Sequence, residues 1–225
     1  MWQGLVEICF PRYCAVCGRQ LLPSEQVLCT ACADDLPKTG FWTMEDNPVA
    51  RSFWGRVPLV HASAFLYFRD ESPYRKMFHK MKYGGREEIG VYLGKLYGRQ
   101  LCRCLWADKP FTLVPVPLGA SKERRRGYNQ ASRIAEGIAQ ATGWPLDARL
   151  LRRVSEKSSQ PGKDRWSRWL NVKDVFALTG RNVPERVMLV DDLITTGATL
   201  DACAHVILAG APGTCLGVLG LGYVE

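Results

Sequence analysis

Residues 187–200 read VMLVDDLITTGATL, and this stretch decides the fold. Four consecutive apolar residues, 187–190, are typical of a strand that is buried on both faces of a parallel sheet. Two adjacent carboxylates, Asp191 and Asp192, follow the strand directly. A turn of small and hydroxyl-bearing residues comes next, and we expect a helix over 199–208. This order predicts an α/β unit whose polar turn lies at the carboxyl end of a central strand.

The chemistry of that turn predicts a sugar-phosphate site. Backbone N–H groups at the start of a helix, together with threonine hydroxyls, suit a phosphate dianion. Gly197 allows the backbone to come close to the phosphate oxygens. The two carboxylates cannot bind a phosphate, but they accept hydrogen bonds from sugar hydroxyls or attract a cation. A phosphate cup beside hydroxyl acceptors is therefore the interpretation that uses every residue of the motif.

A plain helix cap, a P-loop and a dinucleotide-binding turn fit the motif less well. Asp and Thr are ordinary capping residues, but a cap does not need two acids, three threonines and a glycine within 191–199. No G-x-x-x-x-G-K-[ST] sequence occurs in the chain, which excludes a P-loop. Gly217, Gly220 and Gly222 are not spaced as in the dinucleotide-binding pattern.

The rest of the chain after residue 58 alternates between strand and helix patterns. Predicted strands lie at 62–68, 112–117, 187–190 and 213–221, and predicted helices at 73–83, 89–105, 129–142 and 199–208. Short extended pieces are expected at 150–154 and 176–178, and a basic loop after Pro117. Strands that alternate with helices predict a doubly wound, mostly parallel sheet with its site at the carboxyl ends of the strands.

Four of the nine cysteines form two C-x-x-C pairs near the N-terminus. The pairs are Cys14 with Cys17 and Cys29 with Cys32, and each is followed by small or turn-forming residues. Two thiolates from each of two tight turns predict a tetrahedral structural Zn²⁺ site. A redox role would need a single C-x-x-C after a strand, which is absent. Cys9 precedes the first pair, and the sequence leaves open whether it assists the zinc.

The positive charge of the chain is concentrated in two stretches. The net charge is +8 over 225 residues, but residues 1–55 carry −2 and residues 56–225 carry +10. Residues 122–133 contribute +4 and residues 149–173 contribute +6. This clustering favours anionic partners such as phosphates or nucleic acid, and the alternative is a solubilising basic face.

The composition indicates a globular protein. Hydrophobic residues make up 47% of the chain and charged residues 23%, which argues against disorder. No apolar run approaches the roughly 18 residues of a membrane span. The first residues, MWQG, do not resemble a signal peptide. We therefore expect a cytoplasmic protein without a membrane span.

The motifs together resemble a known family. The strand, Asp-Asp and Thr-Thr-Gly-x-Thr arrangement is similar to the signature of the type I phosphoribosyltransferases. Two C-x-x-C pairs ahead of such a domain resemble the ComF family. The supporting residues are MKYG at 81–84, PVP at 115–117, RGYNQ at 126–130, Ser159, Gln160, Arg165, Arg168, Asn171, Val172 and Phe176. The resemblance covers most of the chain. It implies a zinc-ribbon-like module and linker over 1–55 and a phosphoribosyltransferase-like domain over 56–225.

The resemblance also implies a ligand, phosphoribosyl pyrophosphate (PRPP) with Mg²⁺. Asp191 and Asp192 would hold the 2′- and 3′-hydroxyls of its ribose. The residues that would hold the 5′-phosphate are Thr195, Thr196, Gly197, Ala198 and Thr199. The residues expected on the pyrophosphate loop and the mobile loop are Arg125, Arg126, Lys157, Gln160 and Arg165. Mg²⁺ would bridge the pyrophosphate and ribose oxygens. If the protein turns over PRPP, an amine or nucleobase nitrogen displaces pyrophosphate; no residue identifies the acceptor.

Two functions agree with these residues. The resemblance implies a role in DNA uptake and natural transformation, with single-stranded DNA and uptake-machinery components as partners. The alternative is a module that binds single-stranded nucleic acid on a retired transferase fold. Its support is the basic charge and three tryptophans that could stack on bases, Trp144, Trp166 and Trp169. Packing in the core or in a loop is the favoured interpretation of these tryptophans, because tryptophan is mostly buried in any fold. A nucleotide-salvage transferase is disfavoured, because such an enzyme has no need of a zinc module.

Overall fold

The computed structural model describes residues 11–154 and 175–224. The elements in chain order are α2 (Thr30–Asp34), the 3₁₀ helix η1 (Phe41–Thr43), α3 (Pro48–Arg51), β1 (His61–Phe68), α4 (Arg75–Tyr83), α5 (Glu88–Leu101), the 3₁₀ helix η2 (Leu105–Ala107), β2 (Thr112–Pro115), α6 (Ala120–Arg126), α7 (Gln130–Thr142), β3 (Leu151–Arg153), β4 (Phe176–Leu178), β5 (Arg186–Ile194), α9 (Ala198–Gly210) and β6 (Cys215–Val224).

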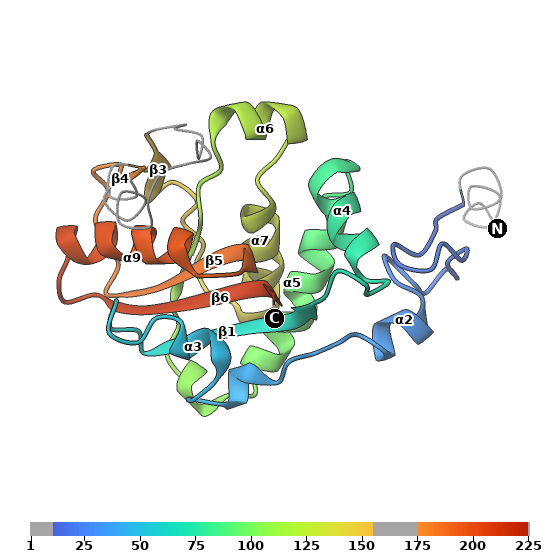
Figure 1. The fold of residues 1–225 in the computed structure, drawn as a ribbon, viewed down its shortest axis with the longest axis horizontal. Coiled ribbons are helices and arrows are strands. Elements are labelled where there is room, and N and C mark those ends of the chain that lie inside the picture. The colour runs from blue at the N-terminus through green and yellow to red at the C-terminus, as the bar shows by residue number, and fades with distance from the viewer. Residues whose placement is uncertain (1–10, 155–174, 225) are drawn as a thin grey trace.

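A four-stranded parallel sheet forms the centre of the molecule, in the order β1-β6-β5-β2 (Figure 1). The register pairs Phe68 with Val224, Asp191 with Gly220 and Pro115 with Val190. All four strands run in the same direction, so their carboxyl ends meet at one edge of the sheet. The predicted α/β fold with a mostly parallel sheet is confirmed.

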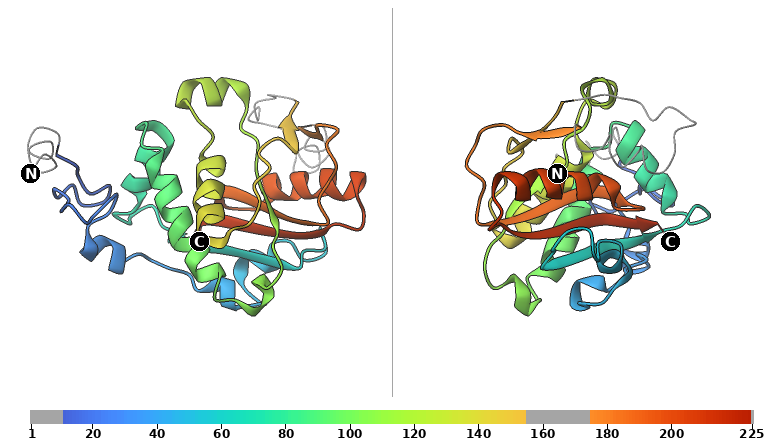
Figure 2. Two further views of the ribbon diagram at one scale, coloured as in Figure 1. Left: turned by 180° about the vertical axis from the view of Figure 1, so that it is seen from behind. Right: turned by 60° about the vertical axis from the view of Figure 1, so that its left-hand side comes forward.

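Helices cover both faces of the sheet, as the two sides of the core show. Alternate residues of β5 go to opposite sides: Met188 and Val190 belong to one buried cluster, and Val187 and Leu189 belong to the other. The first cluster contains buried residues of α4, α5 and α7, and the second contains those of α3 and α9. Figure 2 shows this arrangement from two further directions. Burial on both faces explains the uninterrupted apolar run in β5.

The two longest helices on one face, α5 and α7, touch through their backbones. A Cβ atom at Gly94 would lie 2.2 Å from the carbonyl oxygen of Ile134, and one at Gly137 would lie 2.1 Å from that of Val91. Both glycines are therefore required for the approach of these helices. The contact fixes the position of α7, which begins at the last residue of the RGYNQ segment at 126–130.

Several predicted elements differ from the structure. The prediction of a basic loop after Pro117 is wrong, because this stretch forms the helix α6, which ends at Gly127 with a φ of 82°. Its arginines lie in the last turn, where their positive charge interacts favourably with the negative end of the helix dipole. β5 does not end at the carboxylates but continues to Ile194. α5 ends at Leu101 rather than at residue 105. The two short extended pieces are confirmed as β3 and β4, which form a separate antiparallel pair with Arg152 opposite Ala177.

The segment between the second cysteine pair and β1 packs onto the sheet. Lys38 makes an antiparallel bridge with Leu66, and the Thr39 hydroxyl donates to the carbonyl oxygen of Ala64 at 2.5 Å. Asn47 caps α3 and donates to the carbonyl oxygen of Ala62 at 2.9 Å. The proposed division at residue 55 stays a prediction.

Over the described ranges 11–154 and 175–224, no helix has the length and apolar character that crossing a bilayer requires.

Candidate functional site

The carboxylate pair lies at the carboxyl edge of the sheet, as the sequence predicted. Asp191 and Asp192 are both half-buried, and the backbone N–H of Asp192 donates to Oδ1 of Asp191 at 2.8 Å. Burial, and then the negative charge of Asp192, raise the pKa of Asp191 to about 7; the Asp192 N–H and the Lys82 ammonium oppose that rise. Asp191 therefore lacks enough hydrogen-bond donors and positive charge around it. Sugar hydroxyls would supply the donors, and a cation such as Mg²⁺ would supply the charge.

The predicted phosphate loop follows the pair at the start of α9. Thr195, Thr196, Ala198 and Thr199 are exposed, and Gly197 is the buried residue before the helix. Gly197 has a φ of 71°, and a Cβ atom there would lie 2.7 Å from the ring of Phe53. Only glycine fits this position, since both the backbone and the neighbouring ring exclude a side chain. The first N–H groups of a helix have no partner within it, so an exposed loop at this place can receive a phosphate.

Arg56 holds this loop from a distant part of the chain, and no sequence pattern pointed to it. Its guanidinium donates to the carbonyl oxygen of Thr196 at 3.0 Å and lies 2.8 Å from Oδ2 of Asp201, in the first turn of α9. The side chain of Asp201 is only 8% exposed. An acid near a phosphate site would repel the ligand, and the guanidinium offsets this charge. Arg56 and Phe53 thus fix the loop in place.

Replacing Arg56 by alanine should destabilise the chain. The change removes the hydrogen bonds to the carbonyl oxygens of Ser52 and Thr196 and leaves the buried carboxylate of Asp201 without its cation, which costs about 2–3 kcal/mol. Urea unfolding measures the loss. The control is Arg51→Ala, because the ion pair of Arg51 with Asp46 is exposed and is worth less than about 1 kcal/mol. Equal effects of the two substitutions would show that Arg56 does not hold the loop.

Lys82 is a second site residue whose role the sequence did not assign. Its ammonium lies 3.0 Å from Oδ2 of Asp192, and both side chains are 18% exposed. Lys82 belongs to the last turn of α4. The hydroxyl of Tyr128 donates to the carbonyl oxygen of Met81, the residue before Lys82. The MKYG and RGYNQ motifs, which are far apart in the sequence, therefore meet beside the carboxylate pair.

The two predicted arginines of the pyrophosphate loop have different surroundings. Arg126 is half-buried; it donates to Gln130 at 2.7 Å and its guanidinium lies 5.1 Å from the ring centre of Tyr83. Arg125 is exposed on α6, as are Lys122 and Arg124. Figure 1 shows α6 beyond the body of the sheet.

Some predicted residues are not placed by the structure. Lys157, Gln160 and Arg165, predicted for the mobile loop, lie outside the described residues, as do Cys9, Trp166 and Trp169. Their roles stay predictions. Trp144 is described, and it is buried against Phe111, which favours a packing role over base stacking.

The four predicted metal ligands come together in space. The sulfur atoms of Cys14, Cys17, Cys29 and Cys32 all lie within 4.8 Å of one another. The first pair lies on a turn closed by the bond from the Gly18 N–H to the Cys14 carbonyl, and the second pair begins α2. Four thiols presented on two turns suit one tetrahedral Zn²⁺. The cluster is confirmed, and the residues fit the metal.

Hydrogen bonds from the backbone favour ionisation of one thiol in this cluster, Cys14. Burial opposes ionisation of the Cys14 thiol, but N–H groups of Cys29, Cys17 and Val16 outweigh it and lower its pKa to about 6. Burial, followed by hydrogen bonding to the other thiols, raises the pKa of Cys32. A lowered thiol pKa favours the thiolate that a metal binds.

The carboxylate of Glu25 links the segment between the cysteine pairs to the start of α2. Its carboxylate accepts from the N–H groups of Leu22 and Thr30, which lie between the pairs and directly after Cys29. These N–H donors lower the pKa of Glu25 to about 2. The carboxylate therefore stays ionised at neutral pH and keeps the segment between the pairs in place.

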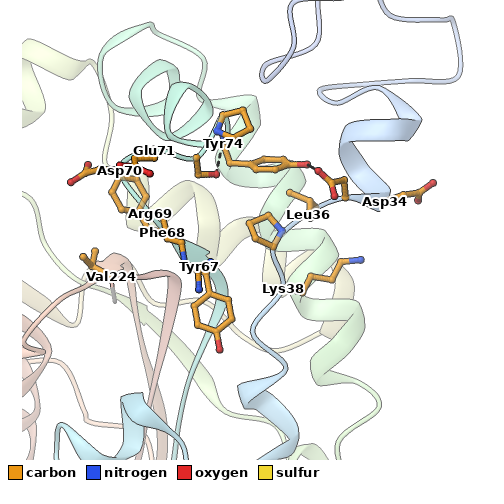
Figure 3. A pocket seen from close by; sticks show the side chains of 14 residues that line it. Asp34, Leu36, Lys38, Tyr67, Phe68, Arg69, Asp70, Glu71, Tyr74 and Val224 are labelled. Atoms are coloured by element: carbon orange, nitrogen blue, oxygen red, sulfur yellow. Dashed lines mark hydrogen bonds between the residues drawn. The ribbon is translucent and has the colours of Figure 1, made fainter.

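A cavity of about 970 Å³ lies beyond the ends of β1 and β6, between the cysteine cluster and the sheet (Figure 3). Its wall combines exposed charged residues with the aromatic rings of Tyr67, Phe68 and Tyr74. The hydroxyl of Tyr74 donates to the Cys32 carbonyl at 3.0 Å and to Asp35 at 3.1 Å. The carboxylate pair and the phosphate loop do not line this cavity, so it is separate from the predicted sugar-phosphate site.

Comparison with known proteins shows relatives along nearly the whole chain. DNA utilization protein YhgH of Salmonella typhimurium is 26% identical over 218 residues, which cover 91% of this chain and 94% of that protein. Competence protein F of Haemophilus influenzae is 35% identical over 101 residues, 44% of each chain. Competence protein ComFC of Bacillus subtilis is 38% identical over 106 residues, 46% of this chain and 41% of that protein. No model of a protein family matches the chain.

Proposed function

We infer from these relatives that the chain belongs to the ComF family. On this premise, we propose that it binds PRPP with Mg²⁺ at the carboxyl edge of its sheet and acts in DNA uptake. Residues 195–199 would bind the 5′-phosphate, and Asp191 and Asp192 would accept hydrogen bonds from the ribose hydroxyls. Magnesium, when bound with the ligand, would neutralise the pyrophosphate and stabilise it as a leaving group. The cysteine cluster would hold one structural zinc.

One observation carries the ligand proposal: two adjacent carboxylates and an exposed helix-start loop occupy the same strand end. Asp191, with its pKa raised to about 7, calls for hydroxyl donors or a cation. The loop after it packs against the ring of Phe53 at Gly197 and is held by Arg56. A phosphate and a vicinal diol within one small molecule would satisfy both halves. The names of the relatives, DNA utilization and competence, support the role in DNA uptake.

Ligand-dependent stabilisation tests the proposal. With Mg²⁺ present, PRPP at about 100 times its Kd should stabilise the chain by about 2.7 kcal/mol in thermal or urea unfolding. Magnesium tripolyphosphate is the control, because it is polyanionic but has no ribose hydroxyls. Equal stabilisation by both compounds would show that basic charge alone binds the ligand. Phosphoribosyl transfer is a separate question, which is measured as pyrophosphate released from PRPP in the presence of an amine.

The helix α6 favours a second candidate function, direct contact with nucleic acid. Lys122, Arg124 and Arg125 are exposed on this short helix, and among the described residues none of them has an ion-pair partner. Cations that project from the body of a protein can reach phosphates of a polyanion. A strand of DNA would then lie across α6. The loop proposed for the 5′-phosphate is a different element, but Arg125 of α6 is also predicted for the pyrophosphate, so PRPP and DNA would share this helix.

The double substitution Arg124→Ala/Arg125→Ala should weaken binding of single-stranded DNA and flatten its salt dependence. Each lost phosphate contact lowers the slope of log K against log salt by about 0.7. Fluorescence anisotropy at several salt concentrations measures the slope. The control is Arg103→Ala/Lys109→Ala, which removes two exposed cations from the segment that precedes β2, away from the carboxyl edge. An unchanged slope in the α6 variant would rule out this helix as the contact.

A further inference from the structure

A lysine of α4 contacts a carboxylate that is proposed to accept a hydrogen bond from a ribose hydroxyl. The Nζ atom of Lys82 lies 3.0 Å from Oδ2 of Asp192, and each side chain is 18% exposed. The contact is an ion pair, and its ammonium competes with a sugar hydroxyl for the same oxygen. A sugar hydroxyl that takes this oxygen displaces the ammonium, which then needs another anionic partner.

The helix that carries Lys82 is anchored on several sides. The ammonium of Lys80 donates to the carbonyl oxygen of Ala15, between the first two cysteines, at 3.1 Å. The hydroxyl of Tyr74 donates to the carbonyl oxygen of Cys32, and that of Tyr128 to Met81. The backbone near Lys82 is thus fixed, while its four-carbon side chain lets the ammonium swing without movement of the helix.

We propose that Lys82 is the residue that recognises the diphosphate at C1 of the sugar phosphate. The inference rests on the proposed function. In PRPP, the diphosphate is attached to the carbon next to the one that bears the 2-hydroxyl. If the carboxylate pair binds the ribose hydroxyls, the diphosphate oxygens lie close to the place where the ammonium now sits. Lys82 then exchanges Asp192 for the diphosphate, and the ribose hydroxyls donate hydrogen bonds to the carboxylate that the ammonium has left.

This exchange gives the site a preference between ligands. PRPP displaces Lys82 from Asp192 but offers it a diphosphate in return. Ribose 5-phosphate displaces Lys82 in the same way but has no diphosphate for the ammonium to contact. Lys82 should therefore strengthen the binding of PRPP and leave the binding of ribose 5-phosphate unchanged or weaken it. A residue that merely held the fold together would affect both ligands in the same direction.

The experiment is a calorimetric titration of the zinc-loaded full chain with each ligand in the presence of Mg²⁺. The variant Lys82→Met keeps the length of the side chain and removes its charge. Lys76→Met is the matched control, because Lys76 is exposed on the same helix. We expect Lys82→Met to weaken PRPP binding about tenfold or more, the usual size of a lost charge-assisted contact. Its affinity for ribose 5-phosphate should stay the same or rise, and Lys76→Met should behave as the wild type.

The outcomes separate the inference from the function on which it rests. If the wild type binds both ligands and Lys82→Met weakens both equally, or neither, the diphosphate role of Lys82 is wrong and the sugar-phosphate site stands. If the folded wild type binds neither ligand, the proposed function and the inference fail together. Lys82→Arg provides a further check: because arginine keeps the charge, it should restore most of the preference for PRPP.

Discussion

Removing the metal from the cysteine cluster should lower the melting temperature of the chain by about 10 °C or more and release about one zinc per chain. Structural zinc in small modules contributes apparent free energies of about 10–16 kcal/mol at neutral pH. Apart from the metal, the module is held by the hydrogen bonds of Glu25 and by a small set of buried apolar residues, among them Leu21, Val27 and Leu28. Without the metal, the close-lying thiols would lose the link between the two turns.

The loss should extend beyond the module itself. Lys80 and Tyr74 connect α4 to the carbonyl oxygens of Ala15 and Cys32, which lie on the two cysteine turns. Chelation should therefore loosen α4, and amide hydrogen exchange should rise in residues 75–83 as well as in 11–36. Cys14→Ser should reproduce the effect. Cys102→Ser is the control, because Cys102 is exposed and outside the cluster. A zinc-free preparation that melts as the native protein does would contradict the structural role of the metal.

Replacing Asp191 by asparagine should stabilise the chain at high pH. Burial and the charge of Asp192 raise the pKa of Asp191 from 3.8 to about 7. Between these pKa values the folded chain holds a proton that the unfolded chain has released, so the free energy of unfolding falls as the pH rises. Above the folded-state pKa the full penalty is present, on the order of 2–4 kcal/mol. Asparagine cannot ionise, yet its side-chain oxygen can still accept from the Asp192 N–H.

Urea unfolding over a range of pH measures this effect. Asp191→Asn should be more stable than the wild type near pH 8, and the difference should shrink to nearly nothing near pH 4, where the wild-type carboxyl is protonated in the folded state. The low-pH measurement thus serves as the internal control. A constant difference across the range would mean that Asp191 is not destabilised by its surroundings, and that the site does not lack positive charge as we infer.

Local patterns predicted the sheet and the site residues that lie within one continuous motif. The apolar run of β5, the acids and the threonine loop are neighbours in sequence, so a strand–turn–helix unit brings them together without help from the rest of the fold. The same is true of the two C-x-x-C turns, whose spacing alone indicates a shared metal. Residues that local geometry brings together are therefore the ones that could be predicted.

The missed site residues depend on contacts between distant segments. Arg56 reaches Thr196 across 140 positions, and its own surroundings, an irregular stretch after α3, carry no signal. Lys82 lies within the MKYG motif, but only the folded chain shows that it meets Asp192. The helix α6 was missed for a different reason. Its seven residues include four cations, a composition that in the sequence resembles a loop. In the structure, Gly127 adopts a positive φ and ends the helix, and the arginines of the last turn interact favourably with the helix dipole.

Calorimetric titration of the zinc-loaded protein with PRPP and Mg²⁺ tests the central claim, that the strand end at residues 191–199 is a sugar-phosphate site. The comparison is the double variant Asp191→Ala/Asp192→Ala, with its fold checked by circular dichroism and its zinc content measured. The account predicts one binding site per chain in the wild type, with binding lost in the double variant while the fold and the zinc are retained. Absence of binding by the folded wild type, or equal binding by the double variant, would contradict it.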